Sequence, residues 1–252
     1  MADGLATIED SSRARRTVSA LASRYQGLAG RALMAAMIER EFAGRIALVS
    51  SFGAESAVLL HLAASIDRSL PVLFLETGKH FPETLAYRDA LIARLRLNGV
   101  VDLRPAAPPL AKEDPEGYLH LADPDRCCEL RKVLPLAPAL APFAAWISGR
   151  KRYQAATRGT LPSIESDATH VKINPIASWG PDDIARYMAE HDLPAHPLVA
   201  KGYPSIGCAP CTEPVAAGED ARAGRWRGKG KVECGIHAVG VPVVLESDGA
   251  GI

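Results

Sequence analysis

The chain has 252 residues, of which 48% are hydrophobic, and its 29 basic side chains balance 29 acidic ones. This length suffices for one α/β domain with appendages, and zero net charge argues against a general nucleic-acid binder, which usually carries a basic surface. No stretch approaches the roughly 18 apolar residues of a membrane span, and the first ten residues lack the features of a signal peptide. We therefore expect a cytoplasmic protein that binds neither nucleic acid nor membranes, and a homo-oligomer is compatible with the sequence.

Short apolar runs alternate with stretches of helical periodicity along most of the chain. This alternation predicts an α/β fold, with a mainly parallel sheet and helices on both faces. We divide the chain into a polar N-terminal segment (1–25), an α/β domain (26–206) and an irregular C-terminal segment (207–252). In chain order, we predict a helix over 28–42, a strand over 45–50, a helix over 57–66, a strand over 71–75, a helix over 82–97, strands over 100–103, 144–148 and 170–173, and a helix over 181–191.

Two loops follow the first two predicted strands. One reads Ser-Ser-Phe-Gly-Ala-Glu-Ser over residues 50–56, and the other reads Glu-Thr-Gly over residues 76–78. Ligands of such sheets bind beyond the carboxyl ends of the strands, so we expect both loops to line one crevice. Backbone N–H groups at the first loop, where a helix begins, favour an oxyanion.

Five cysteines form a doublet, a C-x-x-C pair and a single residue. Four thiolates are the usual ligands of a [4Fe–4S] cluster or a structural zinc ion. Two adjacent cysteines can bind one tetrahedral zinc ion only in a strained geometry, whereas a cluster offers them separate iron atoms. This difference favours a cluster. The alternative zinc set is Cys208, Cys211, Cys234 and His237, whose C-x2-C and C-x2-H spacings fit zinc. The doublet is Cys127-Cys128, where a helix should begin after Pro124.

The segment 222–231 carries five cations and no acidic residue, and it leads directly to Cys234. A solvated basic tail is one interpretation. The other is an anion site beside a nucleophile, because nearby cations lower the pKa of a thiol and guanidinium groups clamp phosphate and sulfate.

Together these residues resemble the assimilatory adenylyl-sulfate (APS) reductases, close relatives of the phosphoadenylyl-sulfate (PAPS) reductases. The resemblance covers about residues 45–238, and the extra cysteine pairs resemble the branch that binds an iron–sulfur cluster. The matching motifs are SFGAES at 51–56, ETGKHFPET at 76–84, the doublet with Lys132 behind it, GRKRYQ at 149–154, CAPC at 208–211, RAGRW at 222–226 and ECGIH at 233–237.

The resemblance implies an adenine-nucleotide α-hydrolase-like (PP-loop-like) fold. It also implies a [4Fe–4S] cluster on Cys127, Cys128, Cys208 and Cys211. The Cys234 thiolate would attack the sulfur of adenosine 5'-phosphosulfate, expel AMP and form a Cys S-sulfonate. Thioredoxin or glutaredoxin would then release sulfite, and we expect this dithiol partner to be external, without a fused thioredoxin-like domain. The substrate-binding residues would be Ser51, Phe52, Gly53, Ser56, Thr77, Gly78, Lys132, Arg152, Arg222, Arg225 and His237.

The sequence departs from the family's patterns at a few positions. Phe52 and Glu55 replace a glycine and an aspartate of the ATP-cleaving loop, which fits nucleotide binding without ATP cleavage, and Lys151 replaces an arginine ahead of Arg152. PAPS reductase activity, alone or dual, would need one further cation, for which Lys151, Arg158 and Lys201 are candidates. Two further functions stay open at this point: a zinc-containing PP-loop-type nucleotide enzyme and an iron–sulfur sensor.

Overall fold

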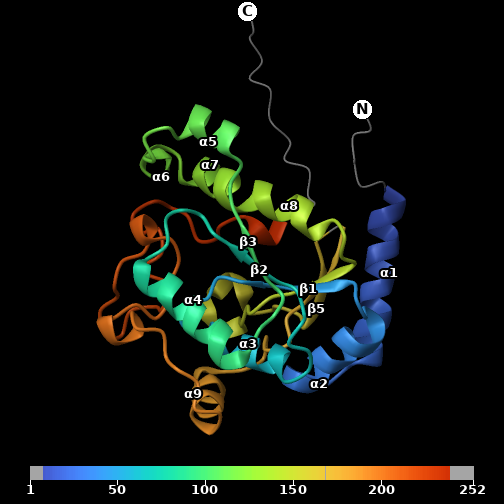
Figure 1. Ribbon diagram of the computed structural model, residues 1–252. Helices are drawn as coiled ribbons and strands as arrows, with labels where there is room; N and C mark the ends of the chain where they lie inside the picture. The colour runs from blue at the N-terminus through green and yellow to red at the C-terminus, as the bar shows by residue number, and fades with distance from the viewer. Residues whose placement is uncertain (1–7, 168, 239–252) are drawn as a thin grey trace, which may run out of the picture.

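The computed structural model describes residues 8–167 and 169–238, and within them the central feature is a six-stranded sheet (Figure 1). The strand order is β3-β2-β1-β4-β6-β5, and all neighbours are parallel except β5 and β6. The prediction of a mainly parallel sheet is confirmed. The strands are β1 (Ile46–Ser50), β2 (Val72–Leu75), β3 (Val100–Leu103), β4 (Ala145–Ile147), β5 (Ile164–Ser166) and β6 (Val171–Ile173).

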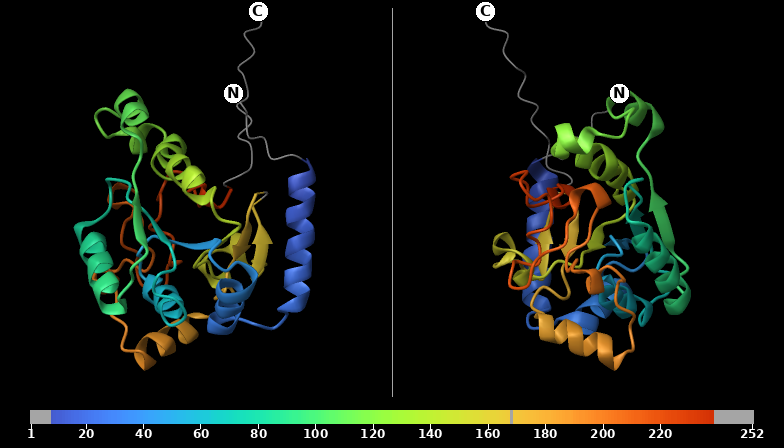
Figure 2. Two further views of the ribbon diagram at one scale, coloured as in Figure 1. Left: turned by 45° about the vertical axis from the view of Figure 1, so that its right-hand side comes forward. Right: turned by 90° about the vertical axis from the view of Figure 1, so that its left-hand side faces the viewer.

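Helices cover both faces of the sheet, as predicted (Figures 1 and 2). Side chains alternate across β1, so Leu48 packs in one core with α3 and α4, whereas Val49 packs in a second core with Leu136 and Leu140 of α8. The helices and helical turns up to β4 are α1 (Ile8–Arg24), α2 (Gly30–Ala35), η1 (Ala36–Glu41), α3 (Ser56–Ala64), α4 (Pro82–Leu95), α5 (Ala107–Glu113), α6 (Leu119–Ala122), α7 (Pro124–Cys128), η2 (Glu129–Val133) and α8 (Leu134–Leu140).

The N-terminal segment contains a helix that its polar composition did not predict. Helix α1 stands beside β5 at the edge of the sheet (Figure 2), and its Leu21 is buried in the core. Helix α1 contacts both β5 and β6, so it packs against this end of the sheet.

The strand order places a ligand-binding position at the centre of the sheet. From β1 the chain moves outward to β2 and β3, then returns to the other side of β1 to form β4 and β6. The order therefore reverses between β1 and β4, and a crevice opens at such a switch point beyond the carboxyl ends of the strands.

Beyond β4 the chain forms β5, β6 and α9 (Pro181–Glu190), and from Ala209 to Ala238 the described residues contain only short helical turns. Within the described residues no helix is long and apolar enough to cross a bilayer. The remaining helices and turns are η3 (Arg152–Gln154), η4 (Ala156–Arg158), α9 (Pro181–Glu190), η5 (Val199–Lys201), η6 (Ala209–Cys211) and η7 (Ile236–Ala238).

Candidate active site

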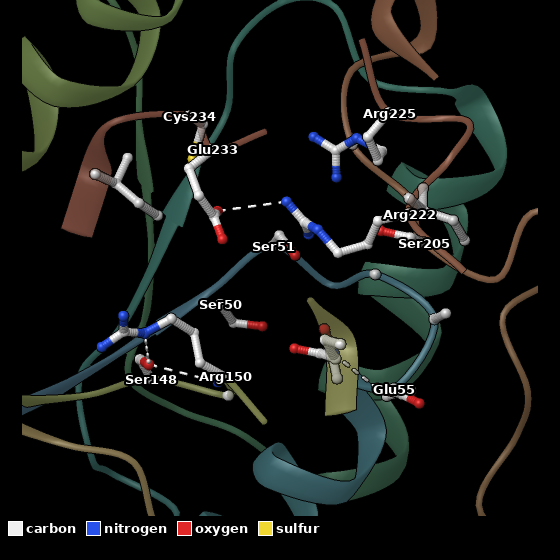
Figure 3. Close-up of a pocket in the computed structure, with 18 of the residues that line it drawn as sticks. Ser50, Ser51, Glu55, Ser148, Arg150, Ser205, Arg222, Arg225, Glu233 and Cys234 are labelled. Carbon is white, nitrogen blue, oxygen red and sulfur yellow. Dashed lines mark hydrogen bonds and ion pairs between the residues drawn. The ribbon is translucent and has the colours of Figure 1, made fainter. Parts of the chain in front are cut away.

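A pocket of about 230 Å³ opens beyond the carboxyl ends of β1 and β4 (Figure 3). Three parts of the chain form its walls and contribute most of its lining: the loop after β1, the segment after β4, and the C-terminal segment, with Leu75, His80 and Lys132 in addition. Residues more than 150 positions apart in the sequence, such as Ser51 and Cys234, therefore line one space.

The loop after β1 is fixed by a residue in an unusual conformation. Phe52 has a φ of 47°, which few residues other than glycine adopt, and its ring is fully buried. The ring meets Phe74 of β2 edge to face, with 5.3 Å between centroids, and the Phe52 N–H donates to the Ser50 hydroxyl at 3.2 Å. Phe52 thus anchors the loop from below, while Ser51 and Gly53 line the pocket.

The second wall is tied to this loop through Glu55. The Lys151 ammonium lies 2.9 Å from the Glu55 carboxylate, and Gln154 donates to it at 3.0 Å. The Tyr153 hydroxyl also donates to Glu55. Nearer the centre, the Arg150 guanidinium contacts Glu165 of β5 and lines the pocket. This wall therefore brings cations to the carboxyl end of β4, each beside a carboxylate.

The third wall carries the half-buried Cys234. Arg222 and Arg225 line the same pocket, and Figure 3 shows them across from Glu233 and Cys234. The Arg225 guanidinium stacks on the Trp226 ring, with 4.3 Å to its centroid, and the Arg225 Nε is buried without a hydrogen-bond partner. A thiol and two guanidinium groups thus face one cavity.

The remaining cations of the 222–231 segment turn away from the pocket. Arg227 pairs with Glu219 at 3.0 Å, the Lys229 ammonium donates to the carbonyl of His120 at 2.8 Å, and Lys231 contacts Asp125. The basic segment therefore divides its charges: two arginines enter the pocket, and the rest attach the segment to neighbouring parts of the molecule.

His237 holds the turn after Cys234 against the sheet. Its ring stacks on Trp146 of β4, with 5.7 Å between centroids and 5° between planes, and its carbonyl accepts from the Lys172 ammonium at 3.1 Å. Burial, together with the nearby Arg150 and Lys172, lowers the pKa of His237 well below its usual value. His237 is therefore neutral near pH 7 and lines the pocket from the sheet side.

Lys132 lies between this pocket and a second, smaller cavity, and lines both. Burial lowers the pKa of Lys132, but the cysteines Cys208, Cys234 and Cys128 more than offset it and hold the pKa above its usual value. The ammonium group is consequently charged, and it stands next to thiols of both cavities.

Four cysteines line the smaller cavity. Cys127 and Cys128 end α7, which begins at Pro124 as predicted, and Cys208 and Cys211 lie at η6. Burial raises the pKa of Cys128 to about 11. Burial also raises the pKa of Cys208, but the Lys132 ammonium and the Thr77 hydroxyl, 3.4 Å from its Sγ, hold it below the usual value.

Within residues 8–167 and 169–238, no three His, Cys, Asp or Glu side chains gather closely enough to hold a single metal ion. The alternative zinc set is not assembled either, since Cys211 lines the smaller cavity and His237 lines the pocket. The four thiols around one cavity match the donor set of a cluster, in which separate metal atoms each take one thiolate.

Comparison with known proteins places the chain in a family. The phosphoadenosine phosphosulfate reductase domain matches residues 45–214. The chain belongs to this family. Adenosine 5'-phosphosulfate reductase from Mesorhizobium japonicum is 53% identical, over 90% of this chain and 91% of its own length, and phosphoadenosine 5'-phosphosulfate reductase from Gloeobacter violaceus is 45% identical, over 88% and 94%.

The fold agrees with this membership. The crystal structure of the phosphoadenylyl-sulfate reductase from Candida auris matches with a TM-score of 0.67 at 23% identity, over 79% of this chain and 97% of that one. The PP-loop-like fold and the resemblance to the APS and PAPS reductases are thus confirmed.

The structure brings most of the predicted family residues together, but not all of them. Leu75 and His80 line the pocket, but residues 76–78 between them do not, and the Thr77 hydroxyl instead lies 3.4 Å from the Cys208 Sγ. Phe52 and Gly78 do not line the pocket, and Arg152 points to the carbonyl of Leu161, with Lys151 lining the wall in its place. The predicted residues that line the pocket are Ser51, Gly53, Ser56, Lys132, Cys208, Arg222, Arg225, Cys234 and His237, of which Lys132 and Cys208 also line the smaller cavity.

Sequence reasoning assigned no site role to Arg150 or Glu233, and neither Ser148 nor Trp146 was singled out. Ser148 and Arg150 directly follow β4, so the strand-end rule that pointed to the loop after β1 would have pointed to them as well. Glu233 belongs to the ECGIH motif at 233–237, but the motif did not indicate its role, which depends on contacts with Arg158 and Arg222.

Proposed function

We propose that the chain is an adenosine 5'-phosphosulfate reductase, which converts APS to sulfite and AMP. The observation that carries this proposal is the Cys234 thiol beside a pocket lined by cations, among them Lys132, Arg222 and Arg225. A nucleophile surrounded by cations suits an anionic electrophile, because the main barrier is to bring two negative groups together.

In the proposed reaction the Cys234 thiolate attacks the sulfur of APS. The bond from that sulfur to the bridging phosphate oxygen breaks, AMP leaves with the electron pair, and Cys234 becomes an S-sulfonate. A thiolate of a reduced dithiol protein then attacks the Cys234 sulfur and expels sulfite, and its second thiol resolves the mixed disulfide. The resident residues bind and orient the anions: the cations offset their repulsion, and the loop after β1 offers backbone N–H groups.

Thioredoxin or glutaredoxin is the proposed reductant. Cys234 is half-buried rather than enclosed, and the glycines at 228 and 230 leave open space around the segment that leads to it. This fits a thiol that must meet a small substrate on one side and a protein partner on the other.

We propose that Cys127, Cys128, Cys208 and Cys211 hold a [4Fe–4S] cluster. Their shared cavity and thiol chemistry support this proposal. Such a cluster would supply structural cross-links and local charge beside Lys132. Iron and sulfide analysis of the anaerobically purified protein tests the proposal: both elements should be present, and a colourless protein lacking both would contradict it.

The substrate is proposed to be APS rather than PAPS because no cation considered for an extra phosphate is free to bind it. Lys151 pairs with Glu55 and Lys201 with Glu83, so an extra phosphate would have to displace one of these carboxylates. Arg158 pairs with Glu233 beside Arg222, where the anionic group common to both substrates would bind. PAPS stays the second candidate because the relative from Gloeobacter violaceus is named for it.

The decisive experiment compares sulfite release from APS and from PAPS by the purified protein with reduced thioredoxin. We expect APS to be preferred, Cys234→Ser to abolish release, and mass spectrometry to find a sulfonate on Cys234 when the reductant is withheld. Equal efficiency with both substrates would contradict the preference. Full activity of Cys234→Ser would overturn the mechanism.

A further inference from the structure

The carboxylate of Glu233 occupies the space between two arginines of the pocket. The Arg158 Nε donates to the Glu233 Oε1 at 2.7 Å, and the Arg222 Nη2 reaches the Oε2 at 3.3 Å. Figure 3 shows Glu233 pointing into the pocket toward Arg222, with Cys234 beside it. The two guanidinium groups, contributed from opposite walls, thus share one internal anion.

Neither arginine is well hydrated in this arrangement. The side chains of Arg158 and Arg222 are 8% and 15% exposed, so without an anion two desolvated positive charges would face each other. Burial and the charge of Arg158 lower the pKa of Arg222, and Glu233 opposes this effect. The pair of arginines therefore needs a negative group, and Glu233 supplies it.

Glu233 is also the member of this cluster that can most easily leave. Its side chain is 31% exposed, twice as much as that of Arg222. It belongs to a segment approached through Gly228 and Gly230, both of which have positive φ and open surroundings. A bound anion can therefore replace Glu233 by a local movement of this segment.

The position of the Glu233 carboxylate constrains the nucleophile next to it in the chain. Arg222 Nη2 donates at 2.6 Å to the carbonyl of Val232, so the arginine that holds the carboxylate also holds the backbone before it. On the other side, His237 fixes the turn after Cys234 against Trp146. The chain is thus held on both sides of Cys234, and release of Glu233 frees the side that precedes Cys234.

We propose that Glu233 is a positioning residue whose carboxylate occupies, between Arg158 and Arg222, the position that the anionic group of the substrate takes when it binds. Binding of that group then displaces Glu233 and releases the segment that carries Cys234. This inference rests on the proposed function for the identity of the anion. Beyond that function, the inference states that the anionic group of the nucleotide competes for Arg158 and Arg222 with the Glu233 carboxylate, which positions the Cys234 thiol.

The test is Glu233→Gln, which keeps the side-chain volume and removes the charge. Calorimetry with AMP should show affinity about fivefold tighter than that of the wild type, because the nucleotide no longer competes with a carboxylate in a partly exposed ion pair. Glu219→Gln is the matched control: Glu219 pairs with Arg227 outside the pocket, and AMP affinity should not change. Unchanged or weaker AMP binding by Glu233→Gln would overturn the proposal.

A second measurement needs no nucleotide. After alkylation with iodoacetamide and tryptic cleavage, the peptide that follows Lys231 contains Cys234 as its one cysteine. Alkylation of Cys234 should be faster in Glu233→Gln than in the wild type and close to wild type in Glu233→Asp, which restores the charge. Equal rates in Glu233→Gln and wild type would contradict the positioning role. Absence of AMP binding in all variants would contradict the proposed function, while the alkylation rates would still decide the role of Glu233.

Discussion

At the scale of single residues, Lys132 is where the two cavities meet. Its ammonium group lies beside Cys208 and Cys128 of the smaller cavity and beside Cys234 of the pocket. Because the group is buried, its electrostatic effect on an anion is screened much less than that of a surface lysine. One side chain can therefore influence both the proposed cluster site and the proposed substrate site.

Replacing Lys132 by methionine should lower kcat/KM for APS by about 100-fold, since a buried charge that faces the reacting anions is lost. Lys132→Arg should recover part of the loss. The control is Lys201→Met, which removes an exposed lysine paired with Glu83 and should change kcat/KM by less than about twofold. Sulfite release measured over a range of APS concentrations decides the matter, and similar losses in Lys132→Met and Lys201→Met would refute the role of Lys132.

At the scale of elements, the loop after β1 shows how the core shapes the pocket. Phe52 does not line the pocket, yet it sets the course of the backbone whose neighbours Ser51 and Gly53 do. The ring packs on Phe74 of the adjacent strand, so the loop and the sheet are one packing unit. Phe52, which the family resemblance gave as a substrate-binding residue, thus acts through packing beneath the loop.

Phe52→Ala should lower the free energy of unfolding by about 3 kcal/mol, the usual range for loss of a buried aromatic ring. It should also raise KM for APS, because the loop loses its anchor. Urea unfolding followed by circular dichroism measures the first effect. Val101→Ala on the exposed face of β3 is the control, and it should cost less than about 0.5 kcal/mol. A loss of stability no larger than that of the control would contradict the anchoring role.

Much of this arrangement could be predicted from sequence. The apolar runs before Ser50 and before Ser148 mark buried strands, and the strand-end rule then indicates the loop at 51–56. Pairings such as Glu55 with Lys151 could not be predicted, because they join segments whose distance in space depends on the whole sheet. Strand β5 was missed because its three residues, Ile-Glu-Ser, show no pattern that separates them from a loop.

At the scale of the whole molecule, Lys172 links the sheet to the C-terminal turn. It lies on β6 and is 2% exposed, with its ammonium 3.4 Å from Glu165 and 3.1 Å from the carbonyl of His237. Burial and the charges of Arg150 and Arg158 lower its pKa to about 7, against the opposing effect of Asp167. The folded state therefore disfavours the charged form that the unfolded chain keeps up to its ordinary pKa of 10.5.

This shift fixes the sign of a pH effect on stability. Between pH 7 and 10.5 the unfolded chain binds more protons at Lys172 than the folded protein, so the free energy of unfolding rises with pH in that window. From pH 7 to pH 9, the wild type should gain about 2 kcal/mol relative to Lys172→Met. Denaturant unfolding of both proteins at the two pH values measures the difference, and parallel pH profiles would show that Lys172 does not contribute.

The stacked pair of His237 and Trp146 has a spectroscopic consequence. The chain has three tryptophans, and Trp146 is the one whose ring is covered by the turn that follows Cys234. Movement of that turn away from the sheet would remove the His237 ring from Trp146 and expose the buried indole to water. The emission of Trp146, isolated by replacing Trp179 with phenylalanine and subtracting the signal of Trp226, would thus report in real time whether the C-terminal turn is docked.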